Sequence, residues 1–260
     1  MARKHSFDMN TIYGNKVIPL LYAGVLVLCL AACHKDLPEG NAQEAEQDTS
    51  TCTFTVSYLK KVYFAPGNLA THGRTFVLNS WDYGGYFAWG TGNKPENNSL
   101  DNRDYASFYD WGDYLNYAES GWRTLGFAEW DYVLVHRKDA ELKRGTGTVN
   151  GIHGLILLPD RWKNPAGIVF NPGCISWNDN ILSRAQWEQM QKSGAVFLPA
   201  SDYEWATNPP HPGMSGLYWT ATPKGDKEAY YVCFYEGRVY TSVVNQRCYR
   251  QSVRLVRDVK

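Results

Sequence analysis

An apolar segment that ends directly at a cysteine limits the part of this chain that can fold into a domain. Residues 17–32 are apolar, follow a basic amino-terminal region and close with the sequence Leu30-Ala31-Ala32-Cys33. This pattern is typical of a secretory signal that ends in a bacterial lipobox. We therefore predict that residues 1–32 are a lipoprotein signal peptide, whose removal leaves Cys33 as the first mature residue. The alternative is an uncleaved helix, although sixteen residues are fewer than the roughly 20 that a transmembrane helix needs.

The predicted modification of Cys33 places the protein at a membrane. Its thiol would carry a diacylglycerol and its amine an acyl chain such as palmitate. Several acyl chains hold a protein at a bilayer stably, whereas a single chain binds marginally. The sequence therefore predicts lipid anchoring to the bacterial outer membrane. His34-Lys35-Asp36 loosely matches the charged stretches that direct Bacteroidales-type lipoproteins to the cell surface, and a spacer without such an address is the alternative.

A tether and a domain follow the anchor. Residues 33–51 contain five acidic side chains, a single lysine and no aromatic ring. Such a composition cannot bury enough apolar surface to order itself, so we predict a flexible acidic tether. Residues 52–260 are long enough to form one hydrophobic core, and we predict that they form a single domain.

The composition indicates a ring-rich domain and excludes a nucleic-acid partner. The 26 basic and 26 acidic residues give no net charge, so the chain lacks the long-range field that would attract nucleic acid. The 10 tryptophans and 18 tyrosines are numerous. Such rings can fill the core of a β-rich domain, or they can provide surface contact area at low entropic cost.

Hydrophobic periodicity predicts short strands separated by turns. Phe54, Val56 and Tyr58 alternate with polar residues, and Glu236-Gly237 suits a tight hairpin turn. The further predicted strands are residues 62–64, 154–159 and 194–199, and then a terminal meander of 217–222, 229–235, 238–244 and 252–256. Between them, residues 84–117 are rich in Gly, Asn, Asp and Tyr without a sustained period. A loop of that length in a domain is usually functional or structured by its own side chains.

Two helices are predicted, which makes the fold class α+β. The first covers about residues 127–136, with Gly126 at the N-cap position. The second begins with a capping box formed by Ser183 and Gln186 and ends at Gly194.

The order of short motifs along the chain resembles a known family. The motifs are residues 62–69, Trp89-Gly90-Thr91-Gly92, Asp110-Trp111-Gly112, Trp122-Arg123-Thr124-Leu125 with Glu129-Trp130, residues 154–160, residues 194–200, Gly216-Leu217-Tyr218-Trp219 and residues 252–256. They resemble a set of Bacteroidales surface proteins that are similar to Fibrobacter-succinogenes-major-paralogue domains. The fold of these domains resembles that of C-type lectins and of the formylglycine-generating enzyme. The resemblance covers residues 54–257 and implies a C-type-lectin-like fold, with two helices packed on short antiparallel sheets and long irregular loops.

The resemblance also suggests where a ligand would bind. In lectin-like folds of this kind, the stretch before the last strand often forms the binding face. In this chain, that stretch corresponds to Tyr240, Asn245, Gln246, Arg247, Tyr249 and Arg250. Rings, guanidinium groups and amides suit sugar or protein surfaces, although a plain polar hairpin tip has a similar composition. The family usually has small residues and Gly where this chain has Cys248-Tyr249-Arg250-Gln251.

Four cysteines follow the predicted anchor, and three pairings are possible. They are Cys52, Cys174, Cys233 and Cys248. An exported chain can keep disulfides, but sequence alone does not choose among the pairings. A hairpin that turns near Glu236-Gly237 would favour the pair Cys233 and Cys248. Small buried thiols would fit equally well.

No motif predicts catalysis, a cofactor or a metal. The sequence has no H-E-x-x-H, G-x-S-x-G, Walker or dinucleotide-binding motif. Trp177-Asn178-Asp179 resembles the calcium-ligating triplet of C-type lectins, but it precedes a helix start instead of lying in a late strand. Formylglycine-generating chemistry requires a closely spaced cysteine pair that binds copper, and Cys233 and Cys248 are separated by a predicted turn and strand.

Together these features predict a lipid-anchored surface protein whose domain binds a glycan or a protein and is not an enzyme. Two alternatives remain. One is an enzyme built on a formylglycine-generating-enzyme-like scaffold that acts on sugars or surface substrates. The other is a structural subunit of a surface appendage or of a polysaccharide-uptake system.

Overall fold

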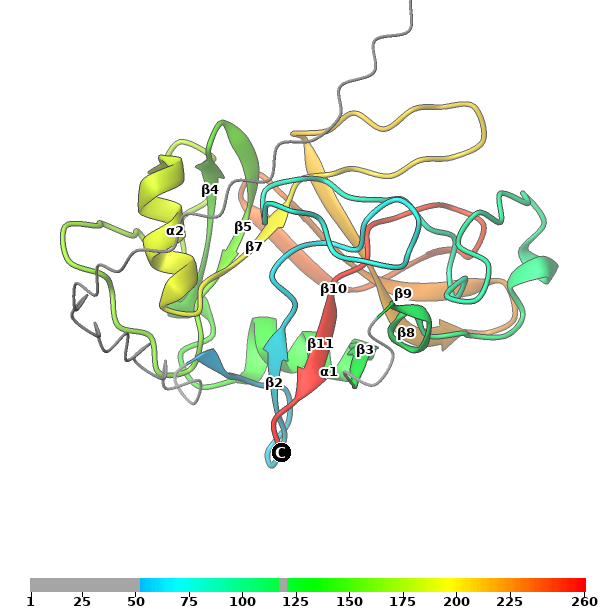
Figure 1. Ribbon diagram of the computed structural model, residues 1–260, viewed down its shortest axis with the longest axis horizontal. Helices are drawn as coiled ribbons and strands as arrows, with labels where there is room; N and C mark the ends of the chain where they lie inside the picture. Colours follow the sequence, from blue (N-terminus) through cyan, green and yellow to red (C-terminus); the bar gives the residue numbers. More distant parts are fainter. Residues whose placement is uncertain (1–51, 117–120) are drawn as a thin grey trace, which may run out of the picture. The chain divides into compact units, whose positions relative to one another are not determined.

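The structure, a computed structural model, describes residues 52–116 and 121–260 (Figure 1). The predicted signal peptide, Cys33 and the predicted tether lie outside the described residues. All described residues belong to one unit of the chain, Glu46–Lys260. Its small, mainly antiparallel sheets and two α-helices confirm the α+β class. Within the described ranges, no helix has the length and apolarity that crossing a membrane requires.

The first sheet joins the two ends of the domain. Its strand order is β1 (Phe54–Thr55), β2 (Lys61–Phe64), β11 (Leu255–Asp258) and β3 (Trp122–Thr124). The final strand therefore lies between β2 and β3 (Figure 1). The prediction that residues 252–256 end the terminal meander is wrong, because Leu255 and Val256 are buried in this sheet instead. The alternation at the amino-terminal end also stops early, and Tyr58 lies exposed in the turn between β1 and β2.

The second sheet carries the longer helix. It contains β6 (Ile181–Leu182), β4 (Arg144–Val149), β5 (Ile152–Leu157) and β7 (Val196–Pro199), in that order. Asn150 and Gly151 both have positive φ in the β4–β5 turn, as a two-residue hairpin often requires. Helix α2 (Arg184–Lys192) buries Trp187 and Met190 against this sheet. The predicted capping box of Ser183 and Gln186 is confirmed.

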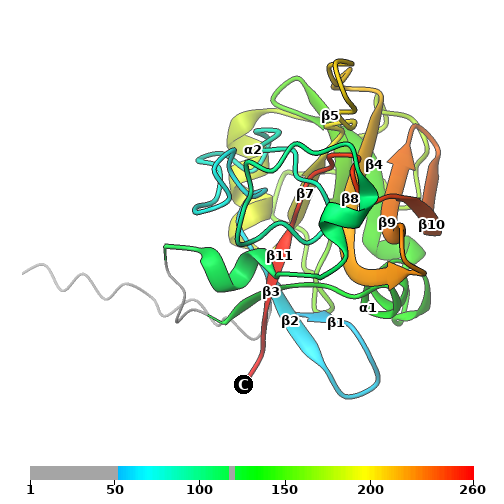
Figure 2. The ribbon, with the colours of Figure 1, turned by 90° about the vertical axis from the view of Figure 1, so that its right-hand side faces the viewer.

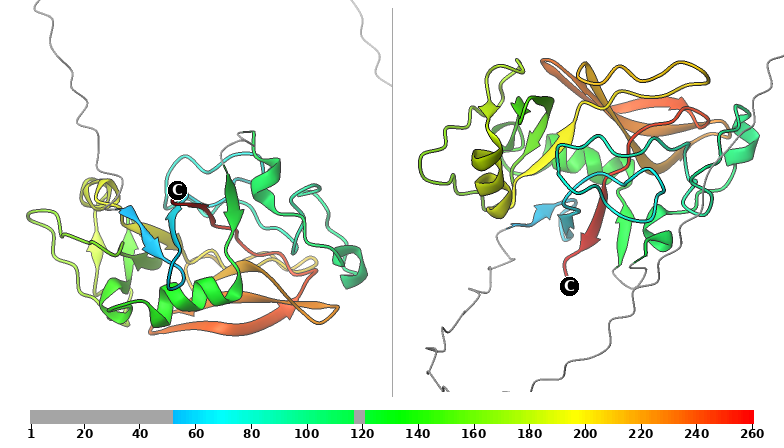
Figure 3. Two further views of the ribbon diagram at one scale, coloured as in Figure 1. Left: turned by 90° about the horizontal axis from the view of Figure 1, so that it is seen from below. Right: turned by 45° about the horizontal axis from the view of Figure 1, so that its top comes forward.

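The third sheet contains most of the predicted meander. Strands β8 (Ser215–Lys224), β9 (Glu228–Tyr235) and β10 (Arg238–Gln246) are consecutive and antiparallel. Tyr235 pairs with Arg238, so the predicted tight turn at Glu236-Gly237 is confirmed. Helix α1 (Phe127–Asp131) and the π-helical turn Tyr132–His136 run along this sheet (Figure 3). Because Gly126 has no side chain for capping, Thr222 of β8 accepts the hydrogen bond from the Phe127 backbone N–H.

The part of the chain that the structure describes also contains three short 3₁₀ helices, Asn102–Tyr105, Trp111–Tyr114 and Glu141–Lys143. The first two lie within the long loop that follows residue 84. This long loop is therefore structured, which is one of the two alternatives that its length predicts. Figure 2 shows this loop covering one side of the domain beside β8.

Most tryptophans fill the core. All ten lie within the described residues, and seven of them are buried: Trp81, Trp89, Trp111, Trp130, Trp177, Trp187 and Trp219. Trp122 and Trp162 are partly buried, whereas Trp205 is exposed. The core interpretation therefore accounts for nearly all of these rings, and it leaves Trp205 to be explained.

The suggested disulfide between Cys233 and Cys248 is not formed, and both thiols are free. The hairpin turns so tightly that Cys233 lies opposite Tyr240. Cys248 follows the end of β10 and packs in a separate buried cluster with Ala88 and Tyr105.

Candidate functional site

The six residues suggested by the family resemblance do not form one surface. Tyr240 lies near the turn of the β9–β10 hairpin, where its hydroxyl is 2.9 Å from that of Tyr235 and accepts a hydrogen bond from Arg238. Asn245 and Gln246 lie at the other end of β10. At about 3.3 Å per residue, Tyr240 is roughly 20 Å from Gln246 along the strand. One small ligand therefore cannot contact residues at both ends of β10.

Arg247 is a structural brace, which corrects its assignment as a ligand contact. Only 3% of this residue is exposed. Its guanidinium lies 4.3 Å from the centre of the Trp89 ring. It donates hydrogen bonds to four backbone carbonyls, those of Tyr105, Ala106, Gly225 and Glu228. Burial lowers the pKa of Arg247, yet a guanidinium stays charged at neutral pH. Four of its five N–H donors bind these carbonyls and the side chain is buried, so it is not a surface contact for a ligand.

Tyr249 and Arg250 are half-buried, and they lie beside a loop that the sequence analysis did not select. Tyr249 stacks on Trp205 with ring centres 5.4 Å apart and planes 15° apart, and it also contacts Tyr203 at 5.6 Å. Tyr203 and Trp205 are each 38% exposed. We call Tyr203, Trp205 and Tyr249 the aromatic platform.

Fixed polar groups border the aromatic platform. Arg250 Nη2 donates to Glu204 Oε1 at 2.8 Å, and Arg250 Nη1 donates to the side-chain oxygen of Asn98. The backbones of Glu204 and Arg250 also exchange two hydrogen bonds. The guanidinium is therefore held between a carboxylate and an amide, and its position relative to the rings is set before any ligand arrives.

Backbone conformation explains how the loop presents Trp205. A tight turn joins Trp205 to Asn208, and Ala206 within it has φ of 51°. Asp202 has φ of 60°, and its carboxylate accepts hydrogen bonds from the His211 backbone and the Ser215 hydroxyl. Left-handed non-glycine residues are costly and tend to cluster at functional sites. This loop has two such residues within five positions, which is typical of a loop at a functional site.

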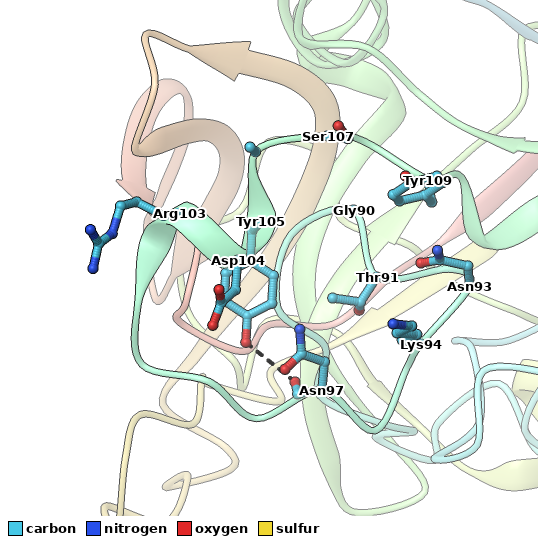
Figure 4. Close-up of a pocket in the computed structure, with 11 residues that line it drawn as sticks. Gly90, Thr91, Asn93, Lys94, Asn97, Arg103, Asp104, Tyr105, Ser107 and Tyr109 are labelled. Atoms are coloured by element: carbon cyan, nitrogen blue, oxygen red, sulfur yellow. Dashed lines mark hydrogen bonds between the residues drawn. The ribbon is translucent and has the colours of Figure 1, made fainter.

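A polar pocket lies next to the aromatic platform, and Figure 4 shows the side chains that line it. Its volume is about 390 Å³. Two stretches of the long loop form its walls, and the lining residues are Gly90, Thr91, Asn93, Lys94, Asn97, Arg103, Asp104, Tyr105, Ala106, Ser107 and Tyr109. Asn97 lines the pocket, whereas its neighbour Asn98 bonds to Arg250 of the platform border. The two features are therefore adjacent.

Two of the motifs that carry the family resemblance build this pocket. Gly90 has φ of 68°, and a Cβ on Gly92 would lie 2.4 Å from the Asp110 carbonyl oxygen. This close approach lets Tyr109 exchange backbone hydrogen bonds with Gly90 and Gly92. Asp110 then fixes the next turn by accepting from the backbone N–H groups of Gly112 and Thr124. The glycines are needed because the two walls of the pocket touch at this point.

The calcium-like triplet and the other cavities bring together no cluster of metal-binding side chains among the described residues. Asp179 of the triplet accepts a hydrogen bond from the Ser176 backbone within a turn. Within residues 52–116 and 121–260, no three His, Cys, Asp or Glu side chains converge as a metal site would require. The polar pocket and two further cavities are lined by one carboxylate each, which are Asp104, Glu141 and Asp101 respectively.

No family model, curated protein or solved structure matches the chain. The geometry of the platform and the pocket is therefore the basis for interpreting the site.

Proposed function

We propose that this protein is a lipid-anchored outer-membrane protein whose domain binds a glycan or a protein ligand and catalyses no reaction. The aromatic platform carries this proposal. Trp205 is exposed although the other tryptophans fill or border the core. Exposed rings of Tyr and Trp are typical of binding surfaces, because they provide a large contact area and lose few rotamers on binding.

The border of the platform supports recognition of a polar partner. Arg250, Glu204 and Asn98 present donors and acceptors next to the rings, and their mutual hydrogen bonds fix them. A preorganised border lowers the entropic cost of binding. Sugars and protein surfaces both combine apolar faces with hydrogen-bonding edges, so both ligand classes fit.

The cavities favour binding over hydrolysis. Most glycosidases need two carboxyl groups about 5 to 9.5 Å apart across the scissile bond. The polar pocket has Asp104 as its single carboxylate, and no other carboxylate lines it. This observation argues against the alternative of a sugar-cleaving enzyme at this site.

Two further parts of the proposal concern the anchor and the fold. The lipobox Leu30-Ala31-Ala32-Cys33 supports the lipid anchor. The C-type-lectin-like fold is supported by two helices, small antiparallel sheets, long loops and the pairing of β2 with β11.

An array of glycans and proteins tests the proposed function. Full-length protein in detergent is applied as wild type and as the double variant Trp205→Ala/Tyr249→Ala. We expect the variant to bind the best ligand at least about tenfold more weakly, because central aromatic residues often contribute 2 kcal/mol or more.

A matched control is available at the β1–β2 turn. Tyr58 and Leu59 are 88% and 90% exposed, so Tyr58→Ala/Leu59→Ala removes a similar apolar area without touching the platform. This control should bind like the wild type. The proposal fails if the wild type binds nothing on the array, or if the platform variant retains full affinity.

A further inference from the structure

The polar pocket contains side chains whose hydrogen-bonding capacity is unused. Among the described residues, Lys94 and Asp104 have no ion-pair partner, in contrast to Arg103, which is paired with Asp101. The side chains of Asn93, Ser107 and Tyr109 likewise make no hydrogen bond within the described part of the chain. The pocket therefore offers a ligand both donors and acceptors.

The charges in the pocket select the chemistry of the ligand. An anion attracted by Lys94 would be repelled by Asp104, and the reverse holds for a cation. Hydroxyl groups both donate and accept, so an uncharged polyhydroxyl ligand satisfies the two groups together. The volume of about 390 Å³ lies near the lower end of the range for small-molecule sites, roughly 300 to 1,000 Å³. One small unit therefore fits.

We infer that this pocket binds one uncharged sugar unit of a glycan whose chain continues onto the aromatic platform. The inference rests on the proposed function and narrows its ligand to a neutral sugar. Asn97 in the pocket and Asn98 at the platform border are consecutive, so a chain of sugars crosses from one to the other over this segment. Tyr109, which is 46% exposed, supplies a ring face beside the pocket.

The walls of the pocket are held in place without a ligand. Tyr105 donates its hydroxyl hydrogen to the backbone carbonyl of Ser99 at 2.7 Å, and Figure 4 shows its ring directed toward Asn97. Arg247 donates to the carbonyls of Tyr105 and Ala106 on the same wall. Arg247 is therefore a positioning residue for the pocket, although it cannot contact the sugar itself.

Saturation-transfer NMR on the full-length protein in detergent tests this inference. The probes are glucose, galactose and N-acetylglucosamine as neutral sugars, with sialic acid as an acidic sugar and free lysine as a charged amino acid. We expect transfer to at least one neutral sugar and no comparable transfer to sialic acid or lysine. The signal should fall to background in Lys94→Ala/Asp104→Ala and drop at least severalfold in Asn93→Ala.

A charge-matched control distinguishes the loss of the pocket side chains from a general effect of removing two charges. Lys138→Ala/Glu141→Ala also removes one charge of each sign from exposed positions outside this pocket, and it should leave the transfer unchanged. The inference is overturned if no neutral sugar receives transfer in the wild type, if the signal survives in the pocket variants, or if sialic acid or lysine binds best.

The array and the NMR experiment test the proposed function and the pocket inference separately. Binding on the array that depends on Trp205 but not on Lys94 and Asp104 would overturn the pocket inference and leave the proposed function standing. Neutral-sugar transfer that depends on the pocket, combined with an array on which nothing binds, would instead overturn the proposed recognition of a larger ligand and retain the pocket.

Discussion

At the scale of single residues, two buried arginines organise the domain through uncharged oxygen acceptors, mostly backbone carbonyls, instead of through carboxylates. Arg247 braces the pocket, and Arg254 ties the core together. Arg254 is 1% exposed and donates to Asn68 Oδ1, the Ala65 carbonyl and the Phe197 carbonyl. Burial lowers the pKa of Arg254 to about 10. At neutral pH it remains charged, and these three acceptors replace its hydration.

Replacing Arg254 should destabilise the protein strongly. Arg254→Ala leaves three buried acceptors without a donor, and each such group costs about 1 to 3 kcal/mol. We expect the free energy of unfolding, measured by urea denaturation, to fall by at least about 3 kcal/mol. The control is Arg257→Ala, whose exposed side chain lies over Trp122 and should cost under about 1 kcal/mol. Equal stability of the two variants would contradict this role.

Single residues also show what the sequence could not provide. Trp205 has the same side chain as the buried tryptophans, but it lies 38% exposed at a tight turn in which Ala206 has positive φ. Arg247 has the composition of a ligand contact, but its burial depends on carbonyls from distant parts of the chain. The family resemblance therefore selected the half-buried Tyr249 and Arg250 of the candidate site, missed Trp205 and misjudged Arg247.

At the scale of elements, local signals predicted the helices and hairpins, and long-range pairing escaped prediction. The capping box at Ser183 and the two-residue turn at Glu236-Gly237 are encoded within a few positions, and both are confirmed. Strand β11 has an equally clear apolar pattern, but its partners β2 and β3 are far away in sequence. Periodicity identifies such a strand without identifying its neighbours.

An ion-pair cluster links α1, β3 and β11 and should make stability depend on acidity. Arg123 of β3 binds both carboxylate oxygens of Glu129 at 2.7 Å and also binds Asp258 of β11. Burial alone would raise the pKa of Glu129. The hydrogen bonds and charge of Arg123, with the Gly126 N–H, outweigh it and hold that pKa below its ordinary value of 4.5.

The sign of the pH effect follows from this shift. The unfolded chain takes up the Glu129 proton first as the pH falls, so the stabilisation is complete above about pH 4.5 and is lost below it. We expect Glu129→Gln to lower the free energy of unfolding by about 1 kcal/mol at pH 7 and to reduce the loss between pH 5 and pH 3. Glu188→Gln, from the exposed pair with Arg184, should have little effect. An unchanged acid dependence in Glu129→Gln would refute the assignment.

At the scale of the whole molecule, the loop that carries Trp205 and the first strands of the described chain lie at opposite edges. In Figures 1 and 2 the loop 200–214 lies at the upper edge, whereas β2 and the end of β11 lie at the lower edge. Tyr203 and Trp205 of the aromatic platform belong to that upper loop, and Tyr249 packs on them from the segment after β10. Strand β1, which begins at Phe54, pairs with β2 at that lower edge.

The proposed anchor gives a direct prediction for the intact protein. Cells that express the wild type and are fed an alkyne fatty acid should yield labelled protein, because acylation requires the Cys33 thiol as its starting point. The variant Cys33→Ala should remain unlabelled, whereas Cys248→Ala should label like the wild type. Label retained by Cys33→Ala would rule out the lipobox assignment.

The central claim is that the platform and its adjoining pocket form the ligand-binding face. Hydroxyl-radical footprinting of the full-length protein, with and without the tightest ligand from the array, measures this directly. We predict that the ligand slows oxidation of Trp205, Tyr203 and Tyr109 severalfold and leaves Tyr58 unchanged. Unaltered oxidation of all three, or protection confined to Tyr58 and the β1–β2 turn, would contradict the account.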